Sequence, residues 1–315
     1  MTNLVADSNL ISSFLPAVVY ANLAAGGGRA RSFVPRIQQV FQAASVPVEF
    51  ISVGSAVELE AAALAAIRCG KRLLVALGGD GTLQALVNAA FGADVILGVL
   101  PAGGGNDFAA SLQLPEDPVA AAEAILRGQP KAVDLARART ADGRVRLYSG
   151  GGGVGIDAEA ARHANGAFRY LPGRLRYVAS ALRALCSYQP IDVRAEFPRS
   201  GLPPIQAKSL LAAILNTPTY GAGIRLAPDA CLDDGWLDVV LVEELTASQV
   251  LRLLPRLLMS GELRTPRIKR FRVQSVRFTT DRLCMFHGDG EILGPTPVEI
   301  EVVPHAVRVL APAGN

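Results

Sequence analysis

The chain has 315 residues, of which 50% are hydrophobic, and its 31 lysine and arginine residues against 28 acidic residues give a net charge of +3. This length corresponds to about two ordinary domains, and a mean hydropathy of +0.30 excludes a disordered chain. Purely apolar runs, such as residues 210–215, are far shorter than the roughly 18 residues that a membrane-spanning helix needs.

Cysteine and histidine content argues against a metal or disulfide framework. The four cysteines lie more than forty residues apart, no CxxC motif is present, and the chain has only 3 histidines. This pattern predicts a protein of a reducing cytoplasm without a zinc site. The first twenty residues carry no basic leader, so we expect no secretory signal.

The first 134 residues predict alternating strands and helices. Continuous apolar runs predict strands at residues 17–21, 48–53, 73–77 and 95–100, and helical periodicity predicts helices at residues 29–44, 58–69 and 82–91. Ser55 is the expected N-cap of the second helix. A strand–loop–helix repeat with continuously apolar strands indicates a parallel sheet covered by helices on both faces.

After residue 134 the pattern changes to short strands separated by turn residues. We expect these strands at residues 145–155, 191–197, 207–216, 236–243, 271–279, 283–287 and 298–303, with helical stretches at 173–187 and 247–259. Such a series indicates an antiparallel sandwich or barrel. The boundary is expected near the Asp142-Gly143 turn or a few residues earlier, which gives an α/β domain over residues 1–137 and a β-rich domain over residues 138–315. The last strand, at about residues 305–315, can return to the first domain.

Charge is distributed unevenly between the two halves. Residues 1–134 carry 8 basic and 11 acidic side chains, whereas residues 135–315 carry 23 basic and 17 acidic side chains. A basic second half could face nucleic acid, an anionic membrane surface or a phosphorylated ligand, and composition alone does not choose among them.

Three glycine-rich segments follow predicted strands, at residues 26–28, 78–81 and 103–105. Ligands of open parallel sheets bind beyond the carboxyl ends of the strands, and glycine lets backbone N–H groups approach an anion. Together the loops predict a phosphate site, although an ordinary turn would explain each one alone. The chain contains no GxxxxGK[ST] motif, and its first loop does not complete the GxGxxG pattern of a dinucleotide-binding fold.

Polar residues lie within the second and third loops. Asp80 stands inside GGDGT, and Asn106 and Asp107 begin the segment after the third loop. A carboxylate beside phosphates would need to hold Mg²⁺, carry a proton or receive a hydroxyl hydrogen bond. The alternative for each residue is a role in a turn or at a helix N-terminus.

These motifs resemble those of the soluble diacylglycerol kinase catalytic family, which includes bacterial lipid kinases and the sphingosine and ceramide kinases. GGDGT at residues 78–82 resembles the family's nucleotide loop. Further segments resemble its other motifs in the same order: ANLAAGGG at 21–28, LPAGGGNDFA at 100–109, GGGVGIDAEA at 151–160, APDACLDDGWLDVVLV at 227–242 and GDGE at 288–291. The ordered set covers nearly the whole chain.

The resemblance implies a fold and a reaction. The fold is an N-terminal parallel-sheet nucleotide domain like that of NAD kinase and phosphofructokinase, then a C-terminal antiparallel β-sandwich domain, with ATP in the cleft between them. The reaction is Mg²⁺-dependent transfer of the γ-phosphoryl group of ATP to the hydroxyl of diacylglycerol or a related lipid. The implied partner is a lipid at the surface of the inner membrane rather than nucleic acid. The enzyme would be cytoplasmic and peripheral at that membrane, and a homodimer is left open.

The resemblance also implies residue roles. Asp289 would be the general base, and Asp80 would be a second catalytic residue near the phosphates and the acceptor hydroxyl. Asp233 and Asp234 would bind Mg²⁺. The implied nucleotide-binding residues are Asn22, Gly78, Gly79, Asp80, Gly81, Thr82, Gly103, Gly104, Asn106 and Glu291.

Some features weaken or compete with these roles. Gly104 stands where the family usually has threonine, and Leu23 where it usually has proline. Taken alone, the Asp-Gly dipeptides of GDGE and of residues 234–235 predict hairpin turns.

The alternatives to a lipid kinase are a kinase of a soluble small molecule, as in the NAD kinases, and a non-catalytic nucleotide sensor. Arginine-flanked apolar faces in the two helical stretches are candidate membrane contacts, or they pack on the β-rich domain.

Overall fold

The computed structural model describes residues 16–156, 179–180, 183–184, 188–221, 223–245, 249, 252–253, 255, 261 and 265–313. The chain divides into two compact units. Unit 1 comprises Met1–Val133 and His305–Asn315, and unit 2 comprises Asp134–Pro304. The predicted helical stretches at 173–187 and 247–259, with their proposed membrane-facing residues, lie largely outside the described residues.

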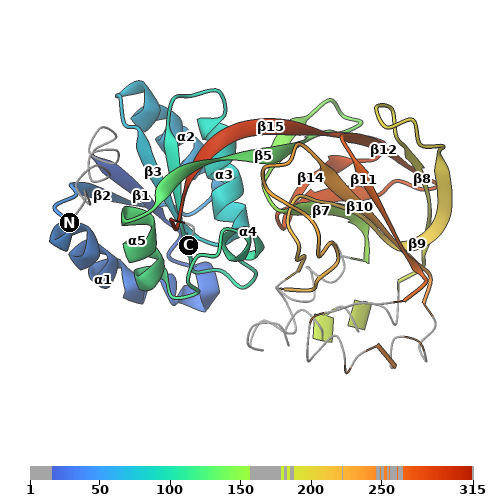
Figure 1. The fold of residues 1–315 in the computed structure, drawn as a ribbon, viewed down its shortest axis with the longest axis horizontal. Coiled ribbons are helices and arrows are strands. Elements are labelled where there is room, and N and C mark those ends of the chain that lie inside the picture. The colour runs from blue at the N-terminus through green and yellow to red at the C-terminus, as the bar shows by residue number, and fades with distance from the viewer. Residues whose placement is uncertain are drawn as a thin grey trace, which may run out of the picture. The chain divides into compact units, whose positions relative to one another are not determined.

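Unit 1 is built on a parallel sheet (Figure 1). Strands β1 (Ala17–Ala21), β2 (Val48–Ser52), β3 (Leu73–Gly78) and β4 (Ile96–Pro101) lie in the order β4-β3-β1-β2. The three strands β1, β3 and β4 are buried along their whole length, which is why their sequences are continuously apolar rather than alternating. The predicted parallel α/β architecture is confirmed.

Helices cover the sheet of unit 1 in two pairs. They are α1 (Ala30–Ala43), α2 (Ala56–Arg68), α3 (Asp80–Ala90) and α5 (Pro118–Leu126), with the short α4 (Asp107–Ser111) between α3 and α5. α1 packs against α5 and α2 packs against α3, and the two pairs lie on opposite faces of the sheet (Figure 1). The Ser55 hydroxyl oxygen accepts a hydrogen bond from Glu58 N at 3.1 Å, so the predicted N-cap is confirmed.

The carboxyl-terminal end of the chain belongs to unit 1. In the last residues of β15 (Val298–Ala311), Arg308 and Val309 pair in parallel with Ile96 and Leu97 of β4. Gly128, which follows α5, lies directly against this strand end. A Cβ atom on Gly128 would stand 2.2 Å from the carbonyl oxygen of Ala311. Because that neighbour is backbone, it cannot move aside without disturbing the strand.

We therefore expect Gly128→Ala to lower the free energy of unfolding by about 1–3 kcal/mol, through overpacking against Ala311. Urea denaturation of the full chain measures the effect. Gln129→Ala, an exposed neighbour, is the control and should stay within about 0.5 kcal/mol of wild type. A Gly128→Ala protein as stable as wild type would contradict the close contact with the strand end.

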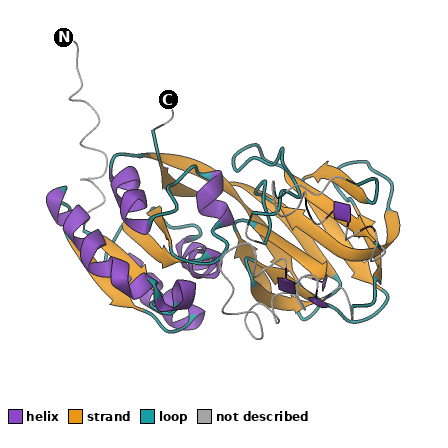
Figure 2. Cartoon of the chain, turned by 90° about the horizontal axis from the view of Figure 1, so that it is seen from below, coloured by secondary structure: helices purple, strands orange, loops and turns teal. Residues whose placement is uncertain are grey.

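Unit 2 is an antiparallel β structure. Its path of paired strands runs β14-β13-β7-β9-β8-β12-β15, while β10 pairs with β9 and β11, and β5 pairs with β15 and β6. The bounds are β5 (Gln129–Arg139), β6 (Val145–Tyr148), β7 (Gly151–Gly155), β8 (Ile191–Glu196), β9 (Ile205–Leu215), β10 (Leu237–Glu243), β11 (Ile268–Val273), β12 (Ser275–Thr280), β13 (Met285–Gly288) and β14 (Glu291–Pro295). Figure 2 shows how strands dominate this unit whereas helices gather in unit 1.

Both faces of the central strands of unit 2 are buried. On β9, Ile214 contributes to one apolar cluster and its neighbours Ala213 and Leu215 to another. On β10, Val239 and Val240 divide between the same two clusters. Side chains on a strand alternate between its faces, so each strand supplies two cores and reads as a continuous apolar run.

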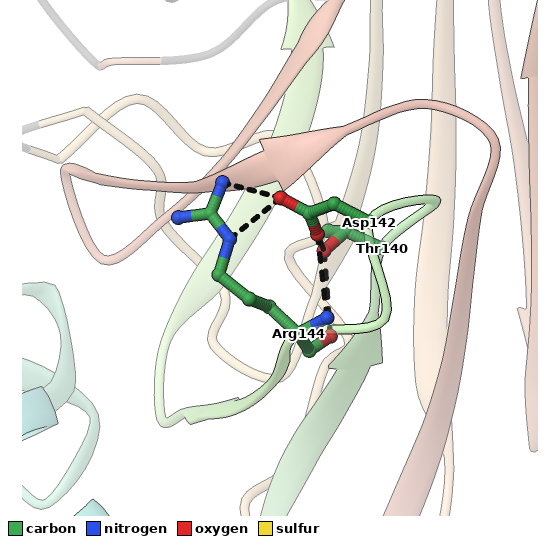
Figure 3. Close-up of polar contacts among 3 residues, drawn as sticks. All are labelled: Thr140, Asp142 and Arg144. Carbon is green, nitrogen blue, oxygen red and sulfur yellow. Dashed lines mark hydrogen bonds and ion pairs between the residues drawn. The ribbon is translucent and has the colours of Figure 1, made fainter.

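Two predicted strands are each broken in two. Residues 145–155 form β6 and β7, which are separated at Ser149 and Gly150, and residues 271–279 fall into β11 and β12, which are separated at Gln274. The Asp142-Gly143 dipeptide forms the turn between β5 and β6 (Figure 3). There the Asp142 carboxylate accepts hydrogen bonds from Thr140 Oγ1 at 2.6 Å and Arg144 Nε at 2.7 Å. The bond from Arg144 is the main reason that the Asp142 pKa is lowered to about 2.

Within the part of the chain that the structure describes, none of the helices combines the length and the apolarity that crossing a lipid bilayer requires.

Candidate functional site

Three loops meet at the carboxyl edge of the sheet in unit 1. The 3-10 turn η2 (Ala25–Gly28) follows β1, residues 78–80 join the end of β3 to the start of α3, and residues 102–106 follow β4. The three strands are parallel neighbours, so their carboxyl ends lie side by side. Two backbone hydrogen bonds tie the loops together: Asn22 N donates to Leu77 O at 3.0 Å, and Ala102 N donates to Gly78 O at 2.8 Å.

Glycine is required where these loops touch. A Cβ atom on Gly103 would lie 2.5 Å from the Cα of Gly79, and one on Gly26 would lie 2.5 Å from Ala102 O. The loops therefore pack backbone against backbone. Gly27 and Gly28 have φ angles of +72° and +92°, and nothing lies within 4 Å of the Cβ that each lacks. A surface of exposed main chain without side chains suits an anionic group such as a phosphate, so these residues fit a nucleotide.

Asp80 joins the second loop to the third. Its Oδ2 accepts a hydrogen bond from Asn106 N at 2.8 Å, and its Oδ1 accepts one from Phe108 N at 3.4 Å. Asp80 thus caps α4 from another element of the fold. Asn106 adopts a left-handed φ of 59°, and its side chain bonds both the N–H and the carbonyl of Gly103, at 3.0 and 3.1 Å. These hydrogen bonds from the backbone of Asn106 and Phe108 hold the third loop to Asp80. They do not test a catalytic role of Asp80, which stays a prediction.

The other predicted nucleotide-binding residues of unit 1 lie in the same place. Asn22 Nδ2 donates to Thr82 Oγ1 at 3.4 Å, and Asn22 Oδ1 accepts from Ala24 N at 3.2 Å, so the first and second loops are also linked by side chains. Gly81 is the second residue of α3, directly after Asp80, and Gly104 lies in the third loop next to Gly103. The sequence therefore predicted a set of residues that the fold does gather.

We expect Asp80→Ala to loosen the third loop, because the N–H groups of Asn106 and Phe108 lose their acceptor. Hydrogen–deuterium exchange should accelerate about tenfold or more in peptides covering residues 103–108. Asp117→Ala removes a comparable cap, the acceptor of Val119 N at 2.8 Å, and should accelerate exchange only near residues 117–120. Unchanged exchange at residues 103–108 would contradict the view that Asp80 holds the third loop in place.

Asp289 lies at the tip of the hairpin between β13 and β14. Gly288 pairs with Glu291, which leaves Asp289 and Gly290 as a two-residue loop with φ angles of +49° and +87°. Positive φ at both central residues defines the type I′ turn that the Asp-Gly dipeptide favours. The hairpin predicted from the dipeptide is therefore present. Glu291 is exposed at the start of β14.

The Asp289 side chain turns inward from this hairpin tip and is only 8% exposed. Its Oδ2 accepts hydrogen bonds from Ser149 N at 2.7 Å and Ser149 Oγ at 2.9 Å. Its Oδ1 accepts from Gly150 N at 2.9 Å and Gly151 N at 3.2 Å. Burial raises the pKa of Asp289, and the four donors oppose that rise. The neighbouring Tyr148 is fully buried, and burial together with the charge of Asp289 raises its pKa well above the usual value.

Two residues that build this arrangement were not predicted from the sequence. Ser149 supplies two of the four donors, and Asn216 holds Ser149 in place by donating from Nδ2 to its carbonyl at 3.0 Å. Asn216 Nδ2 also donates to Asp134 O at 2.9 Å. The sequence does show Ser149 directly before four consecutive glycines, which marks an unusual segment. Nothing in the sequence, however, indicates that this segment contacts GDGE at residues 288–291.

The Asp-Asp-Gly segment forms a turn before β10. Asp234 Oδ1 accepts from Trp236 N at 2.9 Å, and its Oδ2 forms an ion pair with Arg272. The buried Asp134 accepts from Gly235 N at 2.6 Å. No three histidine, cysteine or acidic residues among those that the structure describes are grouped to hold a metal ion. Asp234 already forms an ion pair with Arg272, so Mg²⁺ at this pair would compete with that guanidinium, and the assignment of Asp233 and Asp234 to a metal stays a prediction.

The pKa of Asp238 on β10 is affected by the charged residues of this turn and its neighbours. Its pKa is raised to about 6, chiefly by burial, with further contributions from Asp234 and Asp229, while Arg272 opposes the rise. The folded state thus binds the proton more tightly than the unfolded state does. This contribution to stability is complete below about pH 4 and is lost as the pH rises through about 6.

Asp238→Asn removes the cost of ionising this carboxyl group. We expect the variant to melt about 2 °C or more above wild type at pH 8 and to differ little from it at pH 4, as measured by thermal denaturation at both values. Asp192→Asn on β8, an exposed position, should show no such difference between the two pH values. An equal shift at both pH values would mean that ionisation of Asp238 is not the cause.

Comparisons with known proteins agree with this division of the chain. Residues 16–138 match the diacylglycerol kinase catalytic domain, and residues 152–311 match the YegS C-terminal NAD kinase beta sandwich-like domain. The second match confirms the predicted β-sandwich like that of NAD kinase. The first match covers the three loops of unit 1, and the second covers Asp289 and Asn216, while Ser149, Gly150 and Gly151 lie between the two matches.

Relatives of known sequence support the same assignment. A diacylglycerol kinase of Mycobacterium tuberculosis is 30% identical over 249 residues, which are 79% of each chain. A probable lipid kinase YegS-like protein of Stenotrophomonas maltophilia is 32% identical over 265 residues, 79% of this chain and 82% of that protein.

Solved structures share the fold. A crystal structure of a diacylglycerol kinase from Bacillus anthracis superposes with a TM-score of 0.70 at 18% identity, over 94% of this chain and 96% of that chain. A second crystal structure from the same organism gives a TM-score of 0.79 at 19% identity, over 99% and 98% of the two chains.

Proposed function

Because the chain belongs to the soluble diacylglycerol kinase catalytic-domain family, we propose that it transfers the γ-phosphoryl group of ATP to the hydroxyl of diacylglycerol or a related lipid. The observation that carries the proposal is Asp289. It is a buried carboxylate of raised pKa, held in one orientation at the tip of a hairpin. A buried aspartate is a stronger base than an exposed one, because burial disfavours its charged form.

The loops of unit 1 supply the nucleotide site of this proposal. Phosphoryl transfer depends mainly on positioning and on neutralising the charge of the phosphates. The glycine-rich loops after β1, β3 and β4 offer main chain for that purpose, and Asp80 and Asn106 keep the second and third loops together. Bound Mg²⁺ would neutralise charge on the ATP phosphates.

Asp289 would receive the proton of the acceptor. As the acceptor oxygen forms its bond to the γ-phosphorus, its hydroxyl proton passes to the Asp289 carboxylate. The bond between the γ-phosphorus and the bridging oxygen breaks, and that oxygen leaves on ADP. The carboxylic acid then returns the proton to water, which completes the cycle.

Exposed apolar side chains close to Asp289 in the sequence favour a lipid acceptor over a soluble one. Leu283, Met285 and Ile292 are 78%, 37% and 56% exposed, and all three belong to the β13–β14 hairpin or to the loop that leads into it. Exposed large apolar side chains that gather on one element mark a contact with an apolar partner. An acyl chain whose hydroxyl end reaches Asp289 would find such a surface within a few residues of it, at the membrane where the lipid resides.

We expect the protein to move label from γ-labelled ATP into an organic-soluble product when it is incubated with Mg²⁺ and vesicles containing diacylglycerol. Asp289→Asn keeps the size of the side chain but cannot accept the proton, so kcat should fall by about 100-fold or more. Thin-layer chromatography of the extracted lipid measures the product. Asp192→Asn, an exposed aspartate of the same unit, should retain wild-type activity.

The same assay separates the competing functions. Label that appears only in water-soluble products would indicate a kinase of a soluble small molecule. ATP binding without any transfer would indicate a nucleotide sensor. Full activity of Asp289→Asn with lipid would remove Asp289 as the base while leaving the lipid kinase in place.

A further inference from the structure

The four hydrogen bonds to Asp289 leave it no free position at which to accept a proton. An ionised carboxylate has about four lone-pair sites, two on each oxygen. Oδ1 accepts from Gly150 N and Gly151 N, and Oδ2 accepts from Ser149 N and Ser149 Oγ. A base in this state can receive the acceptor's proton only if one of its donors gives way.

The four donors differ in their freedom to do so. The N–H groups of Ser149, Gly150 and Gly151 are fixed by the backbone, which enters β7 at Gly151 and is tied by Asn216 N donating to Gly150 O at 2.7 Å. The Ser149 hydroxyl is the exception, because it can rotate about its Cβ–Oγ bond. A hydroxyl also accepts hydrogen bonds, which a backbone N–H cannot do. It can therefore donate to the carboxylate and afterwards accept from the carboxylic acid.

We propose that Ser149 is a positioning residue of this kinase, whose hydroxyl holds Asp289 Oδ2 until the acceptor's proton arrives there and then turns to accept a hydrogen bond from the new acid. The inference rests on the function proposed above and names Oδ2 as the oxygen that takes the proton. Ser149 is 0% exposed and acts through Asp289 rather than by touching the substrate.

The effect of the Ser149 hydroxyl on the pKa of Asp289 must be separated from that of the other titratable groups around the hairpin tip. His287 on β13 and Glu291 on β14 flank the hairpin tip, and Tyr148 on β6 lies against it. Burial and the charge of Asp289 raise the pKa of Tyr148 well above its usual value, so Tyr148 stays neutral at ordinary pH. The Ser149 hydrogen bond lowers the pKa of Asp289, so its removal should raise that pKa.

The test compares the pH dependence of lipid phosphorylation in wild type, Ser149→Ala and Ser149→Cys. The base works when ionised, so activity is lost as the pH falls through the pKa of Asp289. In Ser149→Ala this acid limb should move up by about one pH unit, because the ionised carboxylate loses a donor. At the plateau kcat should fall about tenfold, because Oδ2 loses the hydroxyl that orients it and the new acid loses its acceptor, while KM for ATP stays unchanged. Ser149→Cys fills the same space with a weaker donor and should lie between the two. Ser209→Ala, an equally buried serine on β9 whose hydroxyl donates to Ala207 O, should leave the profile in place.

A second measurement does not depend on turnover. The side-chain carboxyl carbon of Asp289, identified in ¹³C-aspartate spectra by its loss in Asp289→Asn, should titrate about one pH unit higher in Ser149→Ala than in wild type. An active Ser149→Ala protein whose acid limb and carboxyl titration both match wild type would overturn the inference alone. A wild-type protein that phosphorylates no lipid would overturn the proposed function and this inference with it.

Discussion

The arrangement of unit 2 around its proposed site depends on one buried carboxylate. Asp289 binds the backbone of Ser149, Gly150 and Gly151 at the place where the chain passes from β6 to β7, and its own N–H donates to Gly151 O at 2.9 Å. A buried charge is tolerated only when hydrogen bonds replace the water that it has lost. These bonds therefore connect a hairpin tip near residue 289 with a strand start near residue 150. They also explain why the predicted strand over residues 145–155 is divided in two, because the N–H groups at its centre point to a carboxylate instead of a neighbouring strand.

Unit 1 uses the same device with different partners. Asp80, also followed by a glycine, accepts hydrogen bonds from Asn106 N and Phe108 N and so joins the loop after β3 to the loop after β4. In both units an aspartate fixes glycine-rich main chain that follows a different strand. Glycine permits the close approach, as the contact between Gly79 and Gly103 shows, and the carboxylate supplies the acceptor that the turned backbone would otherwise lack. Residues that the family motifs single out for chemistry are thus also the residues that hold the loops of the fold together.

Because Asp289 both holds the loop before β7 and is the proposed base, its hydrogen bonds restrict how the proposed reaction can work. A carboxylate that is already saturated with donors is well oriented but has no free lone pair, and burial raises its proton affinity while the donors lower it. A rotatable hydroxyl among three fixed N–H groups resolves this conflict, because it is the one donor that can also serve as an acceptor. Asp80 differs in this respect, since the N–H groups of Asn106 and Phe108 that bind its carboxylate belong to the backbone. These two backbone bonds hold the loop after β4 against Asp80.

Local pattern in the sequence determined much of this protein. Apolar runs gave β1, β3 and β4, Ser55 gave the cap of α2, and the Asp-Gly dipeptide gave the hairpin at Asp289. Each of these depends on residues a few positions apart, so the sequence shows both cause and effect. The ordered motifs likewise assigned the family. Only the tertiary structure decided that Ser149 serves Asp289 across 140 positions, that Asp80 caps α4, and that Arg272 compensates Asp234. These partners meet because strands and loops distant in the chain become neighbours in the fold, and no local periodicity or spacing records such a meeting.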